Sequence, residues 1–178
     1  MSVTVAIERP HHPGVRELLR QSDEFAFSLY PPESCYLVDA DELAAPGVAV
    51  FAARSTGAVT AGAAGAAEAA GAAEAAGAGD VDILGIAALL PREGFSEVKR
   101  MFVAEPARGL GVGRALLDAV ETHARRSGVR RLQLETGPLQ HAAIAMYGRL
   151  GFERIPNFGP YTGDEFSLCF AKDLAPRE

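Results

Sequence analysis

Three glycines alternate with other residues in the segment Arg108-Gly-Leu-Gly-Val-Gly-Arg114, which follows a strand-like run and opens an amphipathic one. Because Gly109, Gly111 and Gly113 lack a Cβ atom, their backbone N–H groups are uncovered. The first N–H groups of a helix have no intrahelical partner and lie at the positive end of the helix dipole. No Ser, Thr, Asp or Asn in this segment offers a cap. The spacing therefore predicts a loop that binds an anion such as a phosphate at the start of a helix.

Other interpretations of this glycine loop are open. A tight turn between a strand and a helix is one, although a single glycine would be enough for it. A dinucleotide-binding fingerprint is another, since Glu135 follows at a tolerable distance for a ribose contact, but Leu116 stands where its third glycine is needed. A nucleoside-triphosphate loop would require Gly-Lys-Ser or Gly-Lys-Thr, which does not follow.

The elements that must position this loop follow an α/β pattern. Apolar residues that alternate or run together predict strands, and apolar residues three or four apart predict helices. One helical stretch ends at Pro31 and Pro32, and a second runs from the glycine loop to Ser127. The expected strands span residues 3–8, 48–53, 81–89, 97–103, 129–136 and 166–171, and a third helix spans 140–150.

Residues 58–80 are almost wholly Ala and Gly, and the unit Gly-Ala-Ala-Glu-Ala-Ala occurs at 65–70 and again at 71–76. A segment without large side chains has nothing to bury in a core, so we expect a mobile low-complexity insertion between two strands, without catalytic residues. The length of 178 residues fits a single domain over residues 1–178 that contains this insertion.

Charge and cysteine content narrow the function classes. A net charge of -6 with scattered basic residues argues against nucleic acid and suits a cationic small molecule or peptide. Cys35 and Cys169 match no metal or redox spacing, so we expect free thiols and no metal site. Neither an apolar signal segment nor a membrane span is apparent. These features predict a cytoplasmic protein without a membrane partner, and they leave a homodimer open.

Five motifs follow one another in the C-terminal half: Glu97–Val103, Arg108–Gly113, Glu135–Gly137, Ala142–Tyr147 and Leu150–Phe152. Together and in this order they resemble the GNAT superfamily of acyl-CoA-dependent N-acetyltransferases. The resemblance implies an α/β fold with a central mixed sheet of about six to seven strands. The sheet is expected to splay at its fourth and fifth strands, with helices on both faces and acetyl-CoA lying in the split.

The resemblance also assigns residues to acetyl-CoA as cosubstrate. The loop amides would bind its pyrophosphate, and the two flanking arginines would add charge-assisted contacts if they point inward. The backbone of the splayed strand would pair with the pantetheine amides. The expected cofactor-binding residues are Met101, Val103, Arg108, Gly109, Gly111, Val112, Gly113 and Arg114.

Attack on a thioester requires an amine that has lost its proton, which for an amine like that of lysine opposes a preference of roughly 4 to 5 kcal/mol at neutral pH. Glu97 matches the position of a glutamate base in some members of the family, and Glu135 on the neighbouring strand is a weaker alternative. Tyr147 matches the family tyrosine that protonates the leaving thiolate. Its position on an apolar helix stripe is also compatible with a purely structural role.

The leading hypothesis is therefore acetyl transfer from acetyl-CoA to a primary amine of a small molecule or peptide, by direct attack on the thioester. The acceptor pocket should lie between the helical region ending at Tyr30 and the loop Phe158–Tyr161. A non-catalytic acyl-CoA-binding sensor or regulatory module is the alternative, since it would need the glycine loop but neither Glu97 nor Tyr147.

Overall fold

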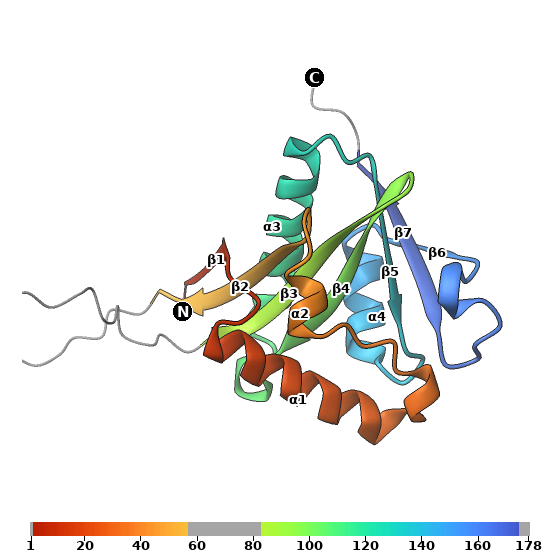
Figure 1. The fold of residues 1–178 in the computed structure, drawn as a ribbon, viewed down its shortest axis with the longest axis horizontal. Coiled ribbons are helices and arrows are strands. Elements are labelled where there is room, and N and C mark those ends of the chain that lie inside the picture. Colours follow the sequence, from red (N-terminus) through yellow and green to blue (C-terminus); the bar gives the residue numbers. More distant parts are fainter. Residues whose placement is uncertain (1, 57–82, 175–178) are drawn as a thin grey trace, which may run out of the picture.

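The computed structural model describes residues 2–56 and 83–174, which form a seven-stranded sheet in the order β1-β2-β3-β4-β5-β7-β6 (Figure 1). The β4–β5 pair is parallel and the other pairs are antiparallel. The expected insertion at 58–80 lies outside the described residues. The strands are β1 (Val3–Ile7), β2 (Ala49–Ser55), β3 (Ile83–Arg92), β4 (Phe95–Val103), β5 (Arg131–Thr136), β6 (Glu153–Ile155) and β7 (Leu168–Asp173).

Helices α1 (Pro13–Leu29) and α2 (Ala40–Leu43) cover one face of the sheet, and α3 (Val112–Arg126) and α4 (His141–Arg149) cover the other (Figure 1). Each face buries its own apolar cluster, one centred on α1 and one on α3. The predicted mixed α/β sheet with helices on both faces is therefore confirmed. Short 3-10 helices occur at η1 (Pro32–Ser34), η2 (Glu105–Ala107) and η3 (Gly159–Tyr161).

Three elements differ from the expectation, two of them because they are short. Strand β6 has three residues and pairs with β7 alone, which is too little for a period-two pattern to be visible in the sequence. The α2 helix is a single turn, with a capping box between Asp39 and Glu42. Strand β4 begins at Phe95, so Glu97 lies within the strand rather than at its start.

Close packing of α3 on β3 holds the glycine loop near the end of β4. A Cβ atom on Gly85 would lie 2.9 Å from Val112 Cγ1 and 3.1 Å from Leu116 Cδ1. Gly85 thus lets the first turns of α3 approach the strand more closely than any other residue would. Val112 and Leu116 are fully enclosed as a result.

Strands β4 and β5 separate after a short common stretch. Their parallel pairing joins Ser96, Glu97 and Val98 to residues 132–134 and ends there, five residues before the end of β4. The predicted splay between the fourth and fifth strands is confirmed. It leaves the edge of β4 that faces β5 without a strand partner from Lys99 onward.

A β-bulge in β4 coincides with the point of separation. The register with β3 shifts by one residue between Ile86↔Phe102 and Ala88↔Lys99. Arg100 has a φ of 54°, the only positive φ of a non-glycine residue among the described positions. The extra residue turns the side chain of Arg100 to the α1 face, where it donates to Leu19 O and Asp23. The bulge therefore changes which β4 side chains face each side of the sheet.

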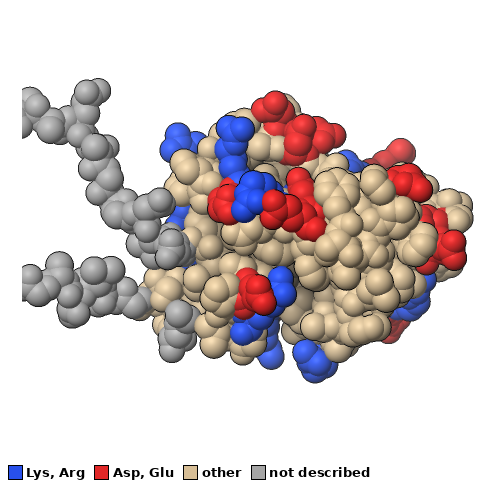
Figure 2. Space-filling model, turned by 90° about the horizontal axis from the view of Figure 1, so that it is seen from below, with Lys and Arg blue, Asp and Glu red and all other residues tan. Residues whose placement is uncertain are grey.

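The surface on the side of α1 carries interspersed acidic and basic side chains (Figure 2). Within residues 2–56 and 83–174, no helix combines the length and the apolar character that crossing a bilayer requires.

Candidate active site at the strand split

The glycine loop opens α3 without a side-chain cap. Gly111 is the N-cap residue with a φ of 80°, and Gly109 has a φ of 78°. A Cβ atom added at either position would meet nothing within 4 Å. Both glycines are therefore required by the left-handed backbone conformation, and the loop faces open space on the side where a ligand could approach.

The first amides of α3 are available to that space. The first bond of the helix runs from Ala115 N–H to Gly111 O at 3.0 Å, so the N–H groups of Val112, Gly113 and Arg114 precede it and have no intrahelical partner. Gly113 has a different structural role from the other two glycines. A Cβ atom there would lie 3.0 Å from Met146 Sδ, so this glycine lets α3 pack closely against α4.

The two arginines beside the loop are not turned over its amides. Arg108 stacks its guanidinium on the rings of Phe25 and Phe102, at 5.2 and 5.7 Å, and its Nε donates to Val103 O at 3.2 Å. Arg114 is exposed and lies 3.6 Å from Asp118 on the same helix. Among the groups predicted to bind the cofactor at this loop, the backbone amides are therefore exposed to a ligand, whereas the two arginine side chains make other contacts.

Met101 and Val103 lie on β4 beyond the point where it leaves β5. Their side chains pack toward the α3 face of the sheet, so their contact with a cofactor would come from the backbone. An unpaired strand edge offers N–H and C=O groups to an extended ligand such as pantetheine. The position of both residues agrees with the expected role, although their residue types carry no signal of it.

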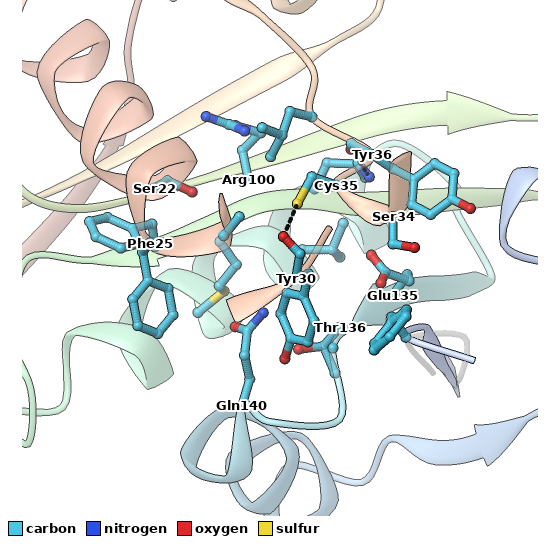
Figure 3. A pocket seen from close by; sticks show the side chains of 18 of the residues that line it. Ser22, Phe25, Tyr30, Ser34, Cys35, Tyr36, Arg100, Glu135, Thr136 and Gln140 are labelled. Atoms are coloured by element: carbon cyan, nitrogen blue, oxygen red, sulfur yellow. Dashed lines mark hydrogen bonds between the residues drawn. The ribbon is translucent and has the colours of Figure 1, made fainter. Parts of the chain in front are cut away.

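A cavity of about 110 Å³ lies where the split opens toward α1 (Figure 3). Its walls come from the end of α1, the connection that follows it, β4, β5 and the start of α4. Tyr30 closes one side, because its hydroxyl accepts a hydrogen bond from Leu139 N–H at 2.9 Å. A Cβ atom on Gly137 would lie 2.1 Å from the Tyr30 ring, so a glycine at the end of the motif Glu135-Thr-Gly137 is needed to make room for that ring.

Tyr147 contributes to both the core and the cavity. Its ring packs against Phe152 and Phe170, and the side chain lines the cavity wall. Burial raises the pKa of its phenol above the ordinary value, with the nearby Glu135 adding to the effect. The hydroxyl is therefore protonated at neutral pH.

The two glutamates considered as bases occupy different places. Glu97 is buried behind the cavity wall, where Arg92 Nε donates to it at 2.9 Å and the Tyr161 hydroxyl at 2.5 Å. Glu135 lines the cavity and accepts a hydrogen bond from Ser167 Oγ at 3.0 Å. Burial raises the pKa of the Glu135 carboxyl above its ordinary value. Of these two carboxylates, only that of Glu135 faces the cavity.

Lys99 is a cavity residue that the sequence analysis did not identify. It is 8% exposed, lines the cavity, and donates to Tyr36 O at 2.7 Å and to the Tyr161 hydroxyl at 2.9 Å. Lys99 lies two residues after Glu97 on β4, and this spacing was the signal in the sequence that both side chains lie on one face of the sheet. That signal did not show that the face is buried.

The predicted loop Phe158–Tyr161 does not form the cavity wall. Phe166, later in the same connection between β6 and β7, lies on the wall instead. Tyr161 supports the wall from behind through its bonds to Lys99 and Glu97. The side chain of Asn157 holds this connection by donating to the carbonyls of residues 161, 164 and 167.

Comparisons with known proteins identify the family of this chain. The model of the acetyltransferase (GNAT) family matches residues 12–152. The chain is 37% identical over 173 residues to the IAA acetyltransferase of Azospirillum brasilense, covering 97% of this chain and 99% of that protein. The fold matches a Klebsiella pneumoniae protein described as an acyl-CoA N-acyltransferase, with a TM-score of 0.68, 28% identity and coverage of 97% and 98% of the two chains.

A second solved structure extends the likeness of the fold. It is the PaiA N-acetyltransferase of Thermoplasma acidophilum in complex with coenzyme A, with a TM-score of 0.68 at 13% identity, covering 97% of this chain and 99% of that one. The order of motifs along the sequence, the split sheet with its uncapped helix, and a family match over residues 12–152 lead to one conclusion: the chain belongs to the acetyltransferase (GNAT) family.

Proposed function

We propose that this acyltransferase moves an acetyl group from acetyl-CoA to a primary amine of a small molecule or peptide. The observation that carries the proposal is the arrangement at the strand split. A cavity with Glu135 and Tyr147 on its wall adjoins the unpaired edge of β4, and the uncapped start of α3 lies on the same face of the sheet as Tyr147. Each part of the reaction then has a residue of suitable chemistry.

The cofactor would be held by backbone groups. The amides of residues 111–114 would bind the pyrophosphate, and the β4 edge at Met101 and Val103 would pair with the pantetheine arm. Acetyl-CoA supplies an acetyl thioester to this site. Two fold neighbours support a cofactor of this class, the Thermoplasma acidophilum protein in complex with coenzyme A and an Elizabethkingia anophelis protein with acetyl-CoA bound.

Glu135 is the carboxylate that faces the acceptor in this proposal. Its negative charge would attract an ammonium group, and its raised pKa suits it to accept the proton that the amine must lose before attack. Glu97, the base favoured from the sequence, would act from behind the residues that line the cavity. Arg92 and Tyr161 already occupy its two carboxylate oxygens.

Tyr147 completes the reaction as general acid. The amine nitrogen forms a bond to the acetyl carbon, the carbon–sulfur bond breaks, and Tyr147 gives its proton to the sulfur. The released thiol has a pKa near that of free cysteine, about 8.5, so this proton transfer accelerates the step without being indispensable.

Release of coenzyme A thiol from acetyl-CoA, followed with a panel of primary amines, tests the proposal. IAA is assayed separately from the amines, because a relative carries IAA in its name. We expect turnover with at least one amine and a mass increase of one acetyl group in that amine. Calorimetry should also detect binding of coenzyme A. Binding without turnover on any acceptor would instead favour the sensor module that the sequence left open.

A further inference from the structure

The ammonium group of Lys99 has unused hydrogen-bonding capacity at the cavity. A lysine ammonium carries three N–H donors. Two of them are used, toward Tyr36 O and the Tyr161 hydroxyl, and no third partner occurs within the part of the chain that the structure describes. A buried donor without a partner is unfavourable by about 1–3 kcal/mol, more for a charged group. Since Lys99 lines the cavity, a ligand atom can supply the missing acceptor.

The lysine is held in this position from both sides. The Tyr161 hydroxyl that accepts from it donates onward to Glu97, which Arg92 also contacts. The ring of Tyr36 packs edge-on against that of Tyr161, with 4.9 Å between the centroids. These contacts fix the position of Nζ before any ligand arrives, as a recognition group requires.

Two other charged groups lie on the wall. Glu135 lines the same cavity from β5. Arg100 also lines it: its Nη2 donates to Asp23 and Leu19 O on α1, and its buried Nε and Nη1 have no hydrogen-bond partner among the described residues. The cavity thus offers one carboxylate and two cations to a ligand, and Lys99 is the cation whose position Tyr36 and Tyr161 fix. Electrostatic complementarity favours a ligand that carries both a carboxylate and an ammonium group.

The rest of the wall limits the size and polarity of that ligand. Aromatic rings of Phe25, Tyr30 and Phe166 surround the cavity and suit an apolar side chain. The cavity of about 110 Å³ is smaller than the clefts of about 300–1,000 Å³ that hold drug-sized ligands, so the part of the acceptor inside it is compact.

Building on the proposed N-acetyltransferase function, we propose that the acceptor is a small apolar α-amino acid whose carboxylate binds Lys99 and whose amino group faces Glu135. Lys99 is then a specificity-determining residue. It selects for an acidic group next to the reacting nitrogen, and it takes no part in the chemistry.

The proposal has a pH signature. Burial lowers the pKa of Lys99, and Arg100 and Arg92 lower it further, while Glu97 and Glu135 oppose the change. A substrate carboxylate adds another negative charge and favours the ammonium form. Binding of an amino acid should therefore weaken as the pH rises through the lowered pKa of Lys99. An amine without the carboxylate has no such dependence on Lys99.

Matched acceptor pairs test the inference on the full-length enzyme. Release of coenzyme A is measured with L-alanine, L-valine and L-leucine. It is also measured with ethylamine, isobutylamine and isoamylamine, which are the same compounds without the carboxylate. We expect kcat/KM to favour the amino acids at least tenfold, with the difference mainly in KM. The KM of the preferred amino acid should rise at alkaline pH.

The variant Lys99→Met should reduce the ratio of amino acid to amine kcat/KM by about 10- to 100-fold, the range for loss of a hydrogen bond to a charged group. Arg126→Met removes a positive charge from an exposed position near the end of α3 and should keep the wild-type ratio. Calorimetry with coenzyme A shows whether each variant is folded.

The possible outcomes separate the two proposals. Equal or better turnover of the decarboxylated amines by the wild-type enzyme overturns the amino-acid inference and leaves the N-acetyltransferase function standing. That comparison needs no variant, so it holds even if Lys99→Met does not fold. An unchanged ratio in folded Lys99→Met also overturns the inference. Turnover of no compound in either series overturns the amino-acid inference, whereas absence of turnover across the wider panel of primary amines overturns the N-acetyltransferase proposal as well.

Discussion

Glu97 and Glu135 have the same side chain and lie on adjacent parallel strands, yet their neighbours give them different chemistry. Glu97 accepts hydrogen bonds from Arg92 and Tyr161, and its side chain does not line the cavity. Glu135 accepts one bond, from Ser167, and faces the cavity. A carboxylate that is desolvated but accessible is suited to accept a proton, whereas one saturated with donors is suited to hold other groups in place.

Replacing Glu135 by Gln should move the acidic limb of the pH profile upward, from the pKa of Glu135 to that of the acceptor amine. A base must be ionised to act, so wild-type kcat/KM should fall as the pH drops through the raised pKa of Glu135, which lies above the ordinary 4.5. In Glu135→Gln, activity should recover at high pH, where the amine loses its proton unaided. The matched variant Glu97→Gln should keep the acidic limb. A loss that is equal at every pH would contradict the base role of Glu135.

Replacing Tyr147 by Phe should lower kcat by about 10- to 100-fold and change the KM for acetyl-CoA much less. The variant keeps the ring that packs on Phe152 and Phe170, so the effect reports on the hydroxyl alone. Steady-state kinetics at fixed acceptor concentration measure both constants. Unchanged turnover would restrict Tyr147 to a structural role.

At the scale of elements, the site exists because two regular structures are interrupted. Strand β4 leaves β5 after Val98 and bulges at Arg100, while α3 begins without a side-chain cap at Gly111. Each interruption leaves backbone groups without a strand or helix partner, and those groups are the ones we assign to the cofactor. Strained or unpaired backbone of this kind is expected at functional sites.

The substitution Gly111→Ala tests the helix start. An alanine at a φ of 80° is strained by about 1–2 kcal/mol, and its Cβ atom would project where the ligand is expected. Gly94 in the β3–β4 turn has a φ of 81° and equally open space, so Gly94→Ala is the matched control. We expect similar losses of stability in thermal unfolding, but weaker acetyl-CoA binding by calorimetry only in Gly111→Ala. Equal affinities would argue against the loop as the pyrophosphate site.

At the scale of the whole molecule, the sheet divides the described residues into two cores that the site joins. The α1 core lies on the side of the proposed acceptor, and the α3 core holds the residues next to the amides proposed to bind the cofactor. Leu116 is fully buried in the α3 core beneath the start of that helix. Leu116→Ala should destabilise the protein by about 2–5 kcal/mol. A free energy of unfolding that is nearly unchanged in denaturant titrations would contradict this packing.

The Ala/Gly segment at 58–80 gives a further test at this scale. Arg54 and Ile83 are register partners on β2 and β3, so the ends of the two strands are adjacent and a short turn can join them. Replacing residues 58–80 by a short Gly-Ser turn should leave the midpoint of thermal unfolding within a few degrees and keep acetyl-CoA turnover. Loss of turnover in the folded variant would assign the segment a part in catalysis.

Signals local in the chain were sufficient to predict the uncapped glycine loop and the amphipathic α3, and the family resemblance predicted the splay of the sheet. The role of Tyr147, which also came from the resemblance, stays a prediction. The three-residue β6, the bulge at Arg100 and the burial of Lys99 could not be predicted in this way. The Glu97–Tyr161 and Lys99–Tyr36 contacts join residues 64 and 63 positions apart. Which carboxylate faces the cavity depends on such distant partners, so only the tertiary structure decided it.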